Sequence, residues 1–383
     1  MIVIRKINII LIMFSFIVLS AWSDNLFAAE SIATFSSVNG EVRVKSAYRE
    51  KGKWLRVKRA GVALFNGDQV KTFAGSAELT FNDGSLMKIS ENSSLSIEER
   101  PTKKKLFGFI DMSYMNRNVK VSFGKLWANV KKARGMWTSF ESRVAVAGIK
   151  GTTVSMFVDS RGDMQFSNME GDVEIAKHDG SFTLKLDKGR DVWVKAEEGG
   201  KTLIQSVKGG MKIYCDDIDI QLEDKGAIIL GLSGKESSVE VTDYSEGSVK
   251  VFASLAVILL DASEAVNIES DNLRNELKIL TPGSSVGYID ILIANVKAAL
   301  DSGEGILIKI DDDKGLATVK IINSVDGIYL IDENGKTFNL EEGNTLDVQT
   351  WGYVSDYSQE KIVPEPELVN PTPPVEPSSP TVP

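Results

Sequence analysis

The chain has 383 residues, of which 43% are hydrophobic and 8% aromatic, and its formal net charge at pH 7 is −9. This length and apolar content suffice for two ordinary domains with hydrophobic cores. One cysteine, Cys215, and one histidine, His178, exclude a disulfide scaffold and argue against zinc or triad chemistry. We therefore expect no catalytic residues, no cofactor and no metal.

The first 29 residues have the pattern of a signal peptide. Arg5 and Lys6 precede an apolar run from residue 7 to residue 19, and Ala28 and Ala29 are candidate cleavage sites. A membrane-spanning helix needs about 20 apolar residues, and this run is shorter. We expect a cleaved signal peptide and an exported chain, periplasmic or at the cell surface. The alternative is an uncleaved inner-membrane anchor with the domains outside.

Residues 31–200 have the pattern of an all-β domain. From residue 38 to residue 97, short apolar and polar alternations are separated by Asn-Gly and Asp-Gly turns. Residues 101–118 fit neither a strand nor a helix period, and we interpret them as a long loop that either covers the core or forms an exposed contact patch. The strand pattern resumes at Val119 and ends near Val194. About a dozen short strands predict an antiparallel β-sandwich or a short β-roll.

The densest part of this pattern runs from residue 140 to residue 180. Gly148 and Gly151 bracket a tight reversal, where glycine tolerates positive φ or a close backbone approach. An alternating strand starts at Thr152, and another follows Gly171. Nothing in this stretch resembles a reaction centre.

Three motifs in this order resemble the FecR-domain family. They are "NGDQVKT", "VAVAGIKGTTVSM" and "MEGDVEI", and the positions that match the family pattern are Gly67, Asp68, Val70, Thr72, Gly148, Gly151, Thr152 and Gly171. The resemblance covers about residues 38 to 195. It implies an extracytoplasmic, β-rich, non-catalytic domain, whose best-known relatives are single-span regulators that relay a signal from an outer-membrane receptor to a cytoplasmic sigma-factor system. Only six residues precede the apolar run, so we expect this chain to lack the cytoplasmic anti-sigma region.

The second half resembles the first. After a linker, the sequence from Val241 aligns without a gap with the sequence from Val70, and three later glycines, Gly327, Gly335 and Gly343, align with Gly171, Gly180 and Gly189. The difference in residue number between aligned positions falls from 171 to 154 along the alignment. This predicts a second, degenerate FecR-like β-rich domain at residues 206–352. A helix over residues 289–300 is the alternative for part of it.

The tail, residues 364–383, holds eight of the ten prolines and is expected to be a disordered spacer. The acidic clusters near residues 216–219 and 311–313 lack the carboxylate spacing of a calcium loop.

Charge is distributed unevenly along the chain. Residues 30–150 contain 22 Lys+Arg and 11 Asp+Glu, whereas residues 151–383 contain 20 and 41. A one-signed surface attracts an anionic partner, although most charge runs only solvate a surface. The candidate contact residues are Lys51, Lys53, Trp54, Arg56, Lys58, Arg59, Lys103, Lys104 and Lys105.

Three functions follow, in this order of preference. The first is a non-catalytic envelope sensing or interaction module, the second a binder of an anionic envelope glycan or polymer, and the third a cell-envelope glycan hydrolase. The expected partner is an envelope protein or an anionic polymer, and no nucleic acid.

Overall fold

A computed structural model describes residues 30–48, 52–106, 110–133, 135–234, 237–244, 249–271, 273–285, 287–311, 313–324, 326–332 and 334–350. The predicted signal peptide and Pro-rich tail lie outside these residues. Within them the chain forms strands, and its one helical piece is a 3-10 turn at Glu198–Gly200. The all-β prediction is confirmed. No helix in these ranges is long and apolar enough to cross a membrane.

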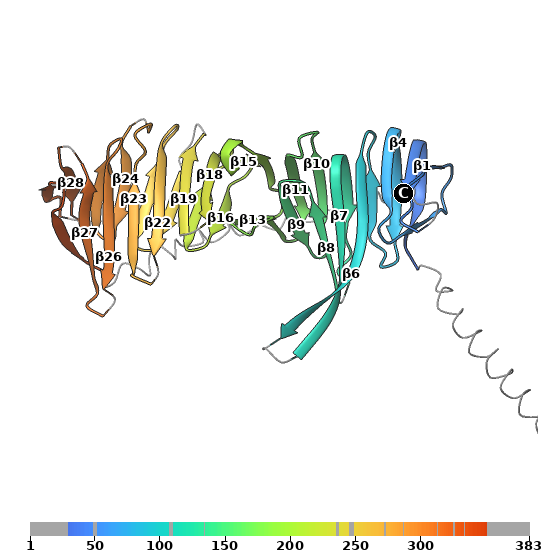
Figure 1. The fold of residues 1–383 in the computed structure, drawn as a ribbon, viewed down its shortest axis with the longest axis horizontal. Coiled ribbons are helices and arrows are strands. Elements are labelled where there is room, and N and C mark those ends of the chain that lie inside the picture. The colour runs from blue at the N-terminus through green and yellow to red at the C-terminus, as the bar shows by residue number, and fades with distance from the viewer. Residues whose placement is uncertain are drawn as a thin grey trace, which may run out of the picture.

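The N-terminal part of the body contains the longest strands. They are β1 (Ser31–Lys45), β2 (Trp54–Val57), β3 (Ala63–Phe65), β4 (Gln69–Phe81), β5 (Leu86–Ile89), β6 (Ser94–Leu106), β7 (Ile110–Asn129), β8 (Met136–Glu141) and β9 (Ala145–Ile149). The strands β1, β4 and β7 each bend and pair with different neighbours along their two halves, so they belong to both sheets of a sandwich. This closes the sandwich at its N-terminal end (Figure 1).

Glycines make the bend possible. Gly40 of β1 lies opposite Gly75 of β4. A Cβ on Gly75 would lie 2.4 Å from the carbonyl oxygen of Asn39, and a Cβ on Gly40 would lie 2.3 Å from that of Ala74. The two backbones approach too closely for any side chain between them.

The rest of the body consists of short hairpins. These strands are β10 (Thr153–Val158), β11 (Met164–Glu170), β12 (Val173–Lys177), β13 (Thr183–Leu186), β14 (Asp191–Ala196), β15 (Thr202–Lys208), β16 (Met211–Cys215), β17 (Ile218–Leu222), β18 (Ala227–Gly234), β19 (Ser237–Asp243), β20 (Val249–Ala253), β21 (Ala256–Leu260), β22 (Ala265–Asp271), β23 (Glu276–Leu280), β24 (Ile289–Ile293), β25 (Val296–Leu300), β26 (Gly305–Asp311), β27 (Leu316–Asn323), β28 (Ile328–Ile331), β29 (Thr337–Leu340) and β30 (Thr345–Gln349).

Successive hairpins are added alternately to the two sheets. Sheet I continues from β7 through β10, β11, β14, β15, β18, β19, β22, β23, β26, β27 and β30. Sheet II continues from β8 through β9, β12, β13, β16, β17, β20, β21, β24, β25, β28 and β29. One cluster of buried apolar side chains fills the space between the sheets along the body. The result is an elongated sandwich whose strands run across its long axis (Figure 1).

A unit of four strands recurs along this sandwich. The strands β12, β16, β20, β24 and β28 begin at residues 173, 211, 249, 289 and 328, so successive units lie 38 to 40 residues apart. Each unit has the same four-residue turn where the chain crosses from sheet II to sheet I. The third turn residue has a positive φ in all five units, at Gly189, Lys225, Ser263, Gly303 and Gly343.

This short unit explains the glycine matches seen in the sequence. Gly171 and Gly327 both lie directly before a sheet II hairpin, four units apart. The other half of the alignment is not structural, because Val70 and Phe81 share β4, whereas Val241 and Phe252 lie in β19 and β20 of different sheets. The division into domains 31–200 and 206–352 stays a prediction.

Two local predictions need correction. The predicted linker at residues 199–236 contains the strands β15 to β18, and β15 pairs with β14 and β18, so sheet I continues through it. The alternative helix at residues 289–300 is the hairpin β24–β25. Its apparent helical spacing arises because Ala294, with φ +48°, shifts the alternation between two strands that each bury every second residue.

The predicted loop at residues 101–118 is also wrong. Residues 101–106 and 110–118 lie in the long strands β6 and β7, where residues 94–106 pair with residues 110–123. The hairpin projects from the body and does not fold over it (Figure 1). Pro101 and the three lysines at residues 103–105 break the apolar–polar alternation, so this stretch has no strand signal.

The glycine corner gives a test of the closed end. Gly75→Ala places a methyl group against the backbone of Asn39 without a φ penalty, so we expect a loss of unfolding free energy of about 1–3 kcal/mol. Gly283→Ala is the matched control, because its Cβ meets nothing within 4 Å. Chemical denaturation of both variants measures the difference. Equal stability of the two variants would contradict the close approach.

Candidate functional site

The first FecR motif fixes a turn. Asp68 is buried, and its carboxylate oxygens accept 2.9 Å hydrogen bonds from the backbone N–H groups of Ala47 and Phe65. Gly67 has φ +82°, in the region that favours glycine. The motif therefore ties the β3–β4 turn to the end of β1.

The same motif also fixes the β5–β6 turn. The Thr72 hydroxyl donates to the carbonyl of Ser90 at 2.6 Å and accepts from the N–H of Ser93 at 2.9 Å. Val70 lies fully buried in the core. The polar side chains of this motif are thus hydrogen-bonded to backbone groups.

Gly151 of the second motif and Gly171 of the third have different surroundings. Gly151 has φ +67°, and a Cβ there would lie 2.7 Å from Cβ of Lys132. Gly171 has φ +85° and lies against Thr152, whose hydroxyl donates to the carbonyl of Asp172 at 3.4 Å. Both positions need glycine for conformation or space.

Position 148 requires glycine neither for a positive φ nor for lack of space. Its φ is not positive, and the nearest atom to a Cβ built there is the carbonyl oxygen of Glu174, at 3.8 Å. Glycine weakens a strand interior by losing entropy and packing. The fold alone therefore does not explain this residue.

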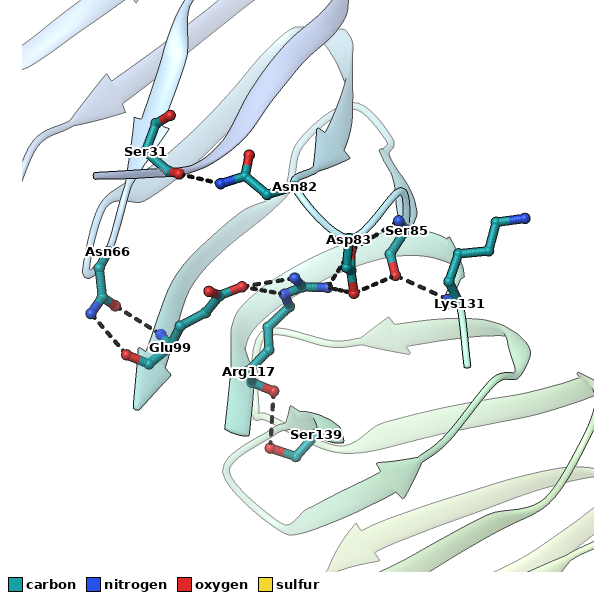
Figure 2. Close-up of polar contacts among 9 residues, drawn as sticks. All are labelled: Ser31, Asn66, Asn82, Asp83, Ser85, Glu99, Arg117, Lys131 and Ser139. Atoms are coloured by element: carbon teal, nitrogen blue, oxygen red, sulfur yellow. Dashed lines mark hydrogen bonds and ion pairs between the residues drawn. The ribbon is translucent and has the colours of Figure 1, made fainter. Parts of the chain in front are cut away.

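A buried arginine anchors the root of the β6–β7 hairpin (Figure 2). Arg117 of β7 is 1% exposed, and its guanidinium donates to Glu99 from Nε at 2.8 Å and pairs with Asp83 at 3.2 Å. It also lies 3.8 Å from the ring centroid of Phe81. Asn66 adds reciprocal hydrogen bonds of 2.7 and 2.8 Å with the Glu99 backbone. Sequence reasoning missed this cluster, because its residues are spread over five strands and turns.

The cluster alters the titration of Asp83. Burial alone would raise the pKa of this carboxyl, but hydrogen bonds from Ser85 and the charge of Arg117 outweigh it and hold the pKa below the ordinary value of 3.8. Asp83 is therefore ionised when the chain is folded at neutral pH.

The predicted basic contact residues do not form one surface. Lys53, Trp54, Arg56, Lys58 and Arg59 are exposed on and beside β2, which pairs with β1 alone among the described strands. Lys103, Lys104 and Lys105 lie on β6 in the projecting hairpin, a separate element, and Lys51 lies outside the described residues. The structure thus brings together only the β2 group.

Two adjoining hollows form a groove on the outer face of sheet II. The larger has a volume of about 570 Å³ and lies over β8, β9, β12 and β13, between Trp137 and Lys185. The smaller, about 280 Å³, lies over β13, β16 and β17, between Lys185 and Gln221. They share Lys185 and Asp187. We call the two hollows together the groove.

Strand register aligns the floor of the groove. Gly148 pairs with Glu174, Glu174 with Lys185, Lys185 with Lys212, and Lys212 with Gln221. These residues form a straight row across sheet II, and all of them point outward because their strand neighbours are buried. At about 4.8 Å per strand, the row spans roughly 19 Å.

The groove is polar, with a cationic excess and an aromatic ring near each end. It is lined by the cations Lys132, Lys150, Lys185, Arg190 and Lys212 and by the carboxylates Asp172, Glu174 and Asp187. Nζ of Lys150 lies 5.2 Å from the ring centroid of Trp137, and Nζ of Lys185 lies 5.3 Å from that of Tyr214. These are cation–π contacts.

The lone histidine and cysteine lie apart. Nε2 of His178 is 2.9 Å from the carbonyl oxygen of Ser142. Burial, and then the charges of Asp216 and Asp219, raise the pKa of the Cys215 thiol to about 12, so it is unreactive near neutral pH. No group of three metal-binding side chains occurs within the described residues.

Comparison with known proteins supports the sequence motifs. Residues 68–174 match the family model described as FecR protein, so the predicted resemblance is confirmed over these residues. Comparison with curated proteins gives no match.

Similarities to solved structures are weak. Two crystal structures of a candidate anti-sigma factor from Parabacteroides distasonis are 17% and 16% identical, with TM-scores of 0.27 and 0.28. Each alignment covers 38% of this chain and 66% of that protein, just under two thirds of its length. The TCP10 domain of Danio rerio CPAP, as its E1021V mutant, is 14% identical over 51% of this chain and 98% of that one, with a TM-score of 0.11.

The arginine cluster gives a stability prediction. Arg117→Gln leaves Asp83 and Glu99 without their cation, so we expect a loss of about 3–5 kcal/mol in unfolding free energy. Arg100→Gln is the matched control: its pair with Glu98 is exposed, at 75% and 41%, and its loss should stay below about 1 kcal/mol. Chemical denaturation of both variants measures the two losses of unfolding free energy. Similar losses would show that the buried cluster does not anchor the hairpin.

The lowered pKa of Asp83 gives a pH prediction. A carboxyl whose pKa is lower in the folded state stabilises the fold above its unfolded pKa, and this stabilisation is lost as the pH falls below about 3.8. The stability advantage of wild type over Asp83→Asn should therefore be constant near pH 7 and shrink below pH 4. Denaturation midpoints of both proteins across this range measure it. A constant advantage down to pH 3 would contradict the assignment.

Proposed function

We propose that this chain, whose residues 68–174 match the FecR family, is an exported, non-catalytic module of the cell envelope that senses or binds an envelope partner. The family match is the observation that carries the proposal. It is supported by the roles of the motif residues: Asp68 and Thr72 bond to backbone groups, and no activated nucleophile or base lies beside them.

The shape of the body suits such a module. The four-strand units extend the sandwich away from the FecR region and leave the outer faces of both sheets uncovered by any other described element. The β6–β7 hairpin projects as a further contact element, held at its root by Arg117. A module of this kind presents surface for binding and needs no reaction centre.

A second candidate function is binding of an anionic envelope polymer. The groove favours it, because five of its charged lining residues are cations and three are carboxylates. The third sequence hypothesis, a glycan hydrolase, needs a pair of carboxylates, and the groove contains Asp172, Glu174 and Asp187. Release of reducing ends from an envelope glycan by the purified chain would support that hypothesis.

Cell fractionation and protease treatment test the proposal. We expect the chain in the envelope fraction, resistant to protease in intact cells or accessible only from outside the inner membrane. His178→Ala and Cys215→Ala should leave its crosslinking to envelope components unchanged, because neither residue belongs to a site. Recovery of the full-length chain from the cytosol would overturn export. Loss of crosslinking by a folded His178→Ala or Cys215→Ala variant would show that the residue belongs to a site, and turnover of an envelope glycan that either variant abolishes would overturn the non-catalytic assignment.

A further inference from the structure

The groove has a floor that only glycine leaves open. Gly148 stands in the row Gly148–Glu174–Lys185–Lys212–Gln221 and points outward into the larger hollow. Neither φ nor packing requires glycine there, since a Cβ would meet nothing closer than 3.8 Å. A larger side chain would fill the hollow between Trp137 and Lys185. The remaining explanation for Gly148 is therefore the space that it leaves.

From this geometry we infer that the groove binds an acidic polysaccharide, with Gly148 forming the floor of the site. The inference deepens the proposed envelope function and rests on it for the biological setting, because it names one face and one ligand class. Three properties of the groove select this ligand: its charge, its mixture of donors and acceptors, and its rings.

The charges exclude two simpler ligands. A neutral sugar chain would leave the cationic excess of the groove desolvated without compensation. A dense polyanion such as polyphosphate would meet Asp172, Glu174 and Asp187 on the same floor and be repelled by them. A chain with one carboxylate per sugar satisfies the cations and still offers hydroxyls to the three carboxylates.

Hydrogen-bonding capacity agrees with this choice. Lysine and arginine only donate, and ionised carboxylates only accept. A sugar hydroxyl both donates and accepts, so it can bridge Glu174 and Lys185, which are neighbours in the row. The amphipathic rings of Trp137 and Tyr214 offer apolar surface near the two ends for the C–H faces of sugar rings.

Other classes of macromolecule fit the groove less well. The phosphodiester backbone of single-stranded DNA only accepts hydrogen bonds, so it offers no donor to Asp172, Glu174 and Asp187. Lysine is depleted at the centres of protein interfaces, and four of the five cations are lysines. A membrane surface cannot follow a concave floor whose hollows total several hundred Å³. Strand faces of β-proteins such as the OB-fold do bind oligosaccharides.

The test is binding of the purified chain to polygalacturonate, an unbranched acidic polysaccharide, with dextran as the neutral probe and polyphosphate and single-stranded DNA as other polyanions. We expect measurable binding to polygalacturonate that weakens as salt is raised, and at least tenfold weaker binding to the other three probes. Equal or tighter binding to dextran, polyphosphate or DNA would overturn the ligand class.

Variants place the site on the groove. Gly148→Leu should weaken polygalacturonate binding at least tenfold without lowering the melting temperature, and Gly283→Leu, at another open glycine, should bind as wild type. Lys185→Gln removes one cation at the junction of the hollows and should weaken binding even if Gly148→Leu proves unstable. Wild-type binding by both Gly148→Leu and Lys185→Gln would overturn the site.

The two proposals fail separately. A chain that is exported and crosslinks to the envelope but does not bind polygalacturonate would overturn the groove assignment alone. A chain that binds polygalacturonate through Gly148 and Lys185 but stays in the cytosol would overturn the envelope function alone.

Discussion

Each hairpin beyond β9 can bury its apolar face only against the opposite sheet, and the rest of the structure depends on this constraint. The chain meets it by adding hairpins alternately to sheet I and sheet II, so that each new pair covers the one before it. Backbone pairing with the previous hairpin of the same sheet fixes the register. The core therefore continues for as long as the four-strand unit repeats, and the outer faces stay free for contacts.

Apolar–polar alternation, turn residues and motifs made much of this fold predictable from the sequence. The inward residues of β10 and β12, such as Val154 and Val173, show a period of two, and the FecR motifs occupy the turns that need positive φ. The repeat of the four-strand unit was not predicted. The four-strand unit has turns occupied by Gly189, Lys225 and Ser263 in turn, so no single residue type marks it. The projecting hairpin lacked a signal because Pro101 and the three lysines at residues 103–105 break the alternation.

The groove could not be predicted from the sequence for a related reason. The basic run around Trp54 is contiguous in sequence but lies on an edge strand, whereas the groove gathers single outward residues from six strands. Lys185 and Lys212 pair directly only because β13 and β16, separated by a whole sheet I hairpin, are neighbours in sheet II. Outward positions in a repeated sandwich are free to vary without cost to the core, so a binding row can be built there one unit at a time.

Hydrogen exchange of the purified chain with and without polygalacturonate tests the groove most directly. We expect slower exchange confined to β8, β9, β12, β13, β16 and β17 and the turns that flank them, with β2 and the C-terminal strands β26 to β30 unchanged. Protection centred on β2 and its basic residues, or no protection on sheet II, would contradict it.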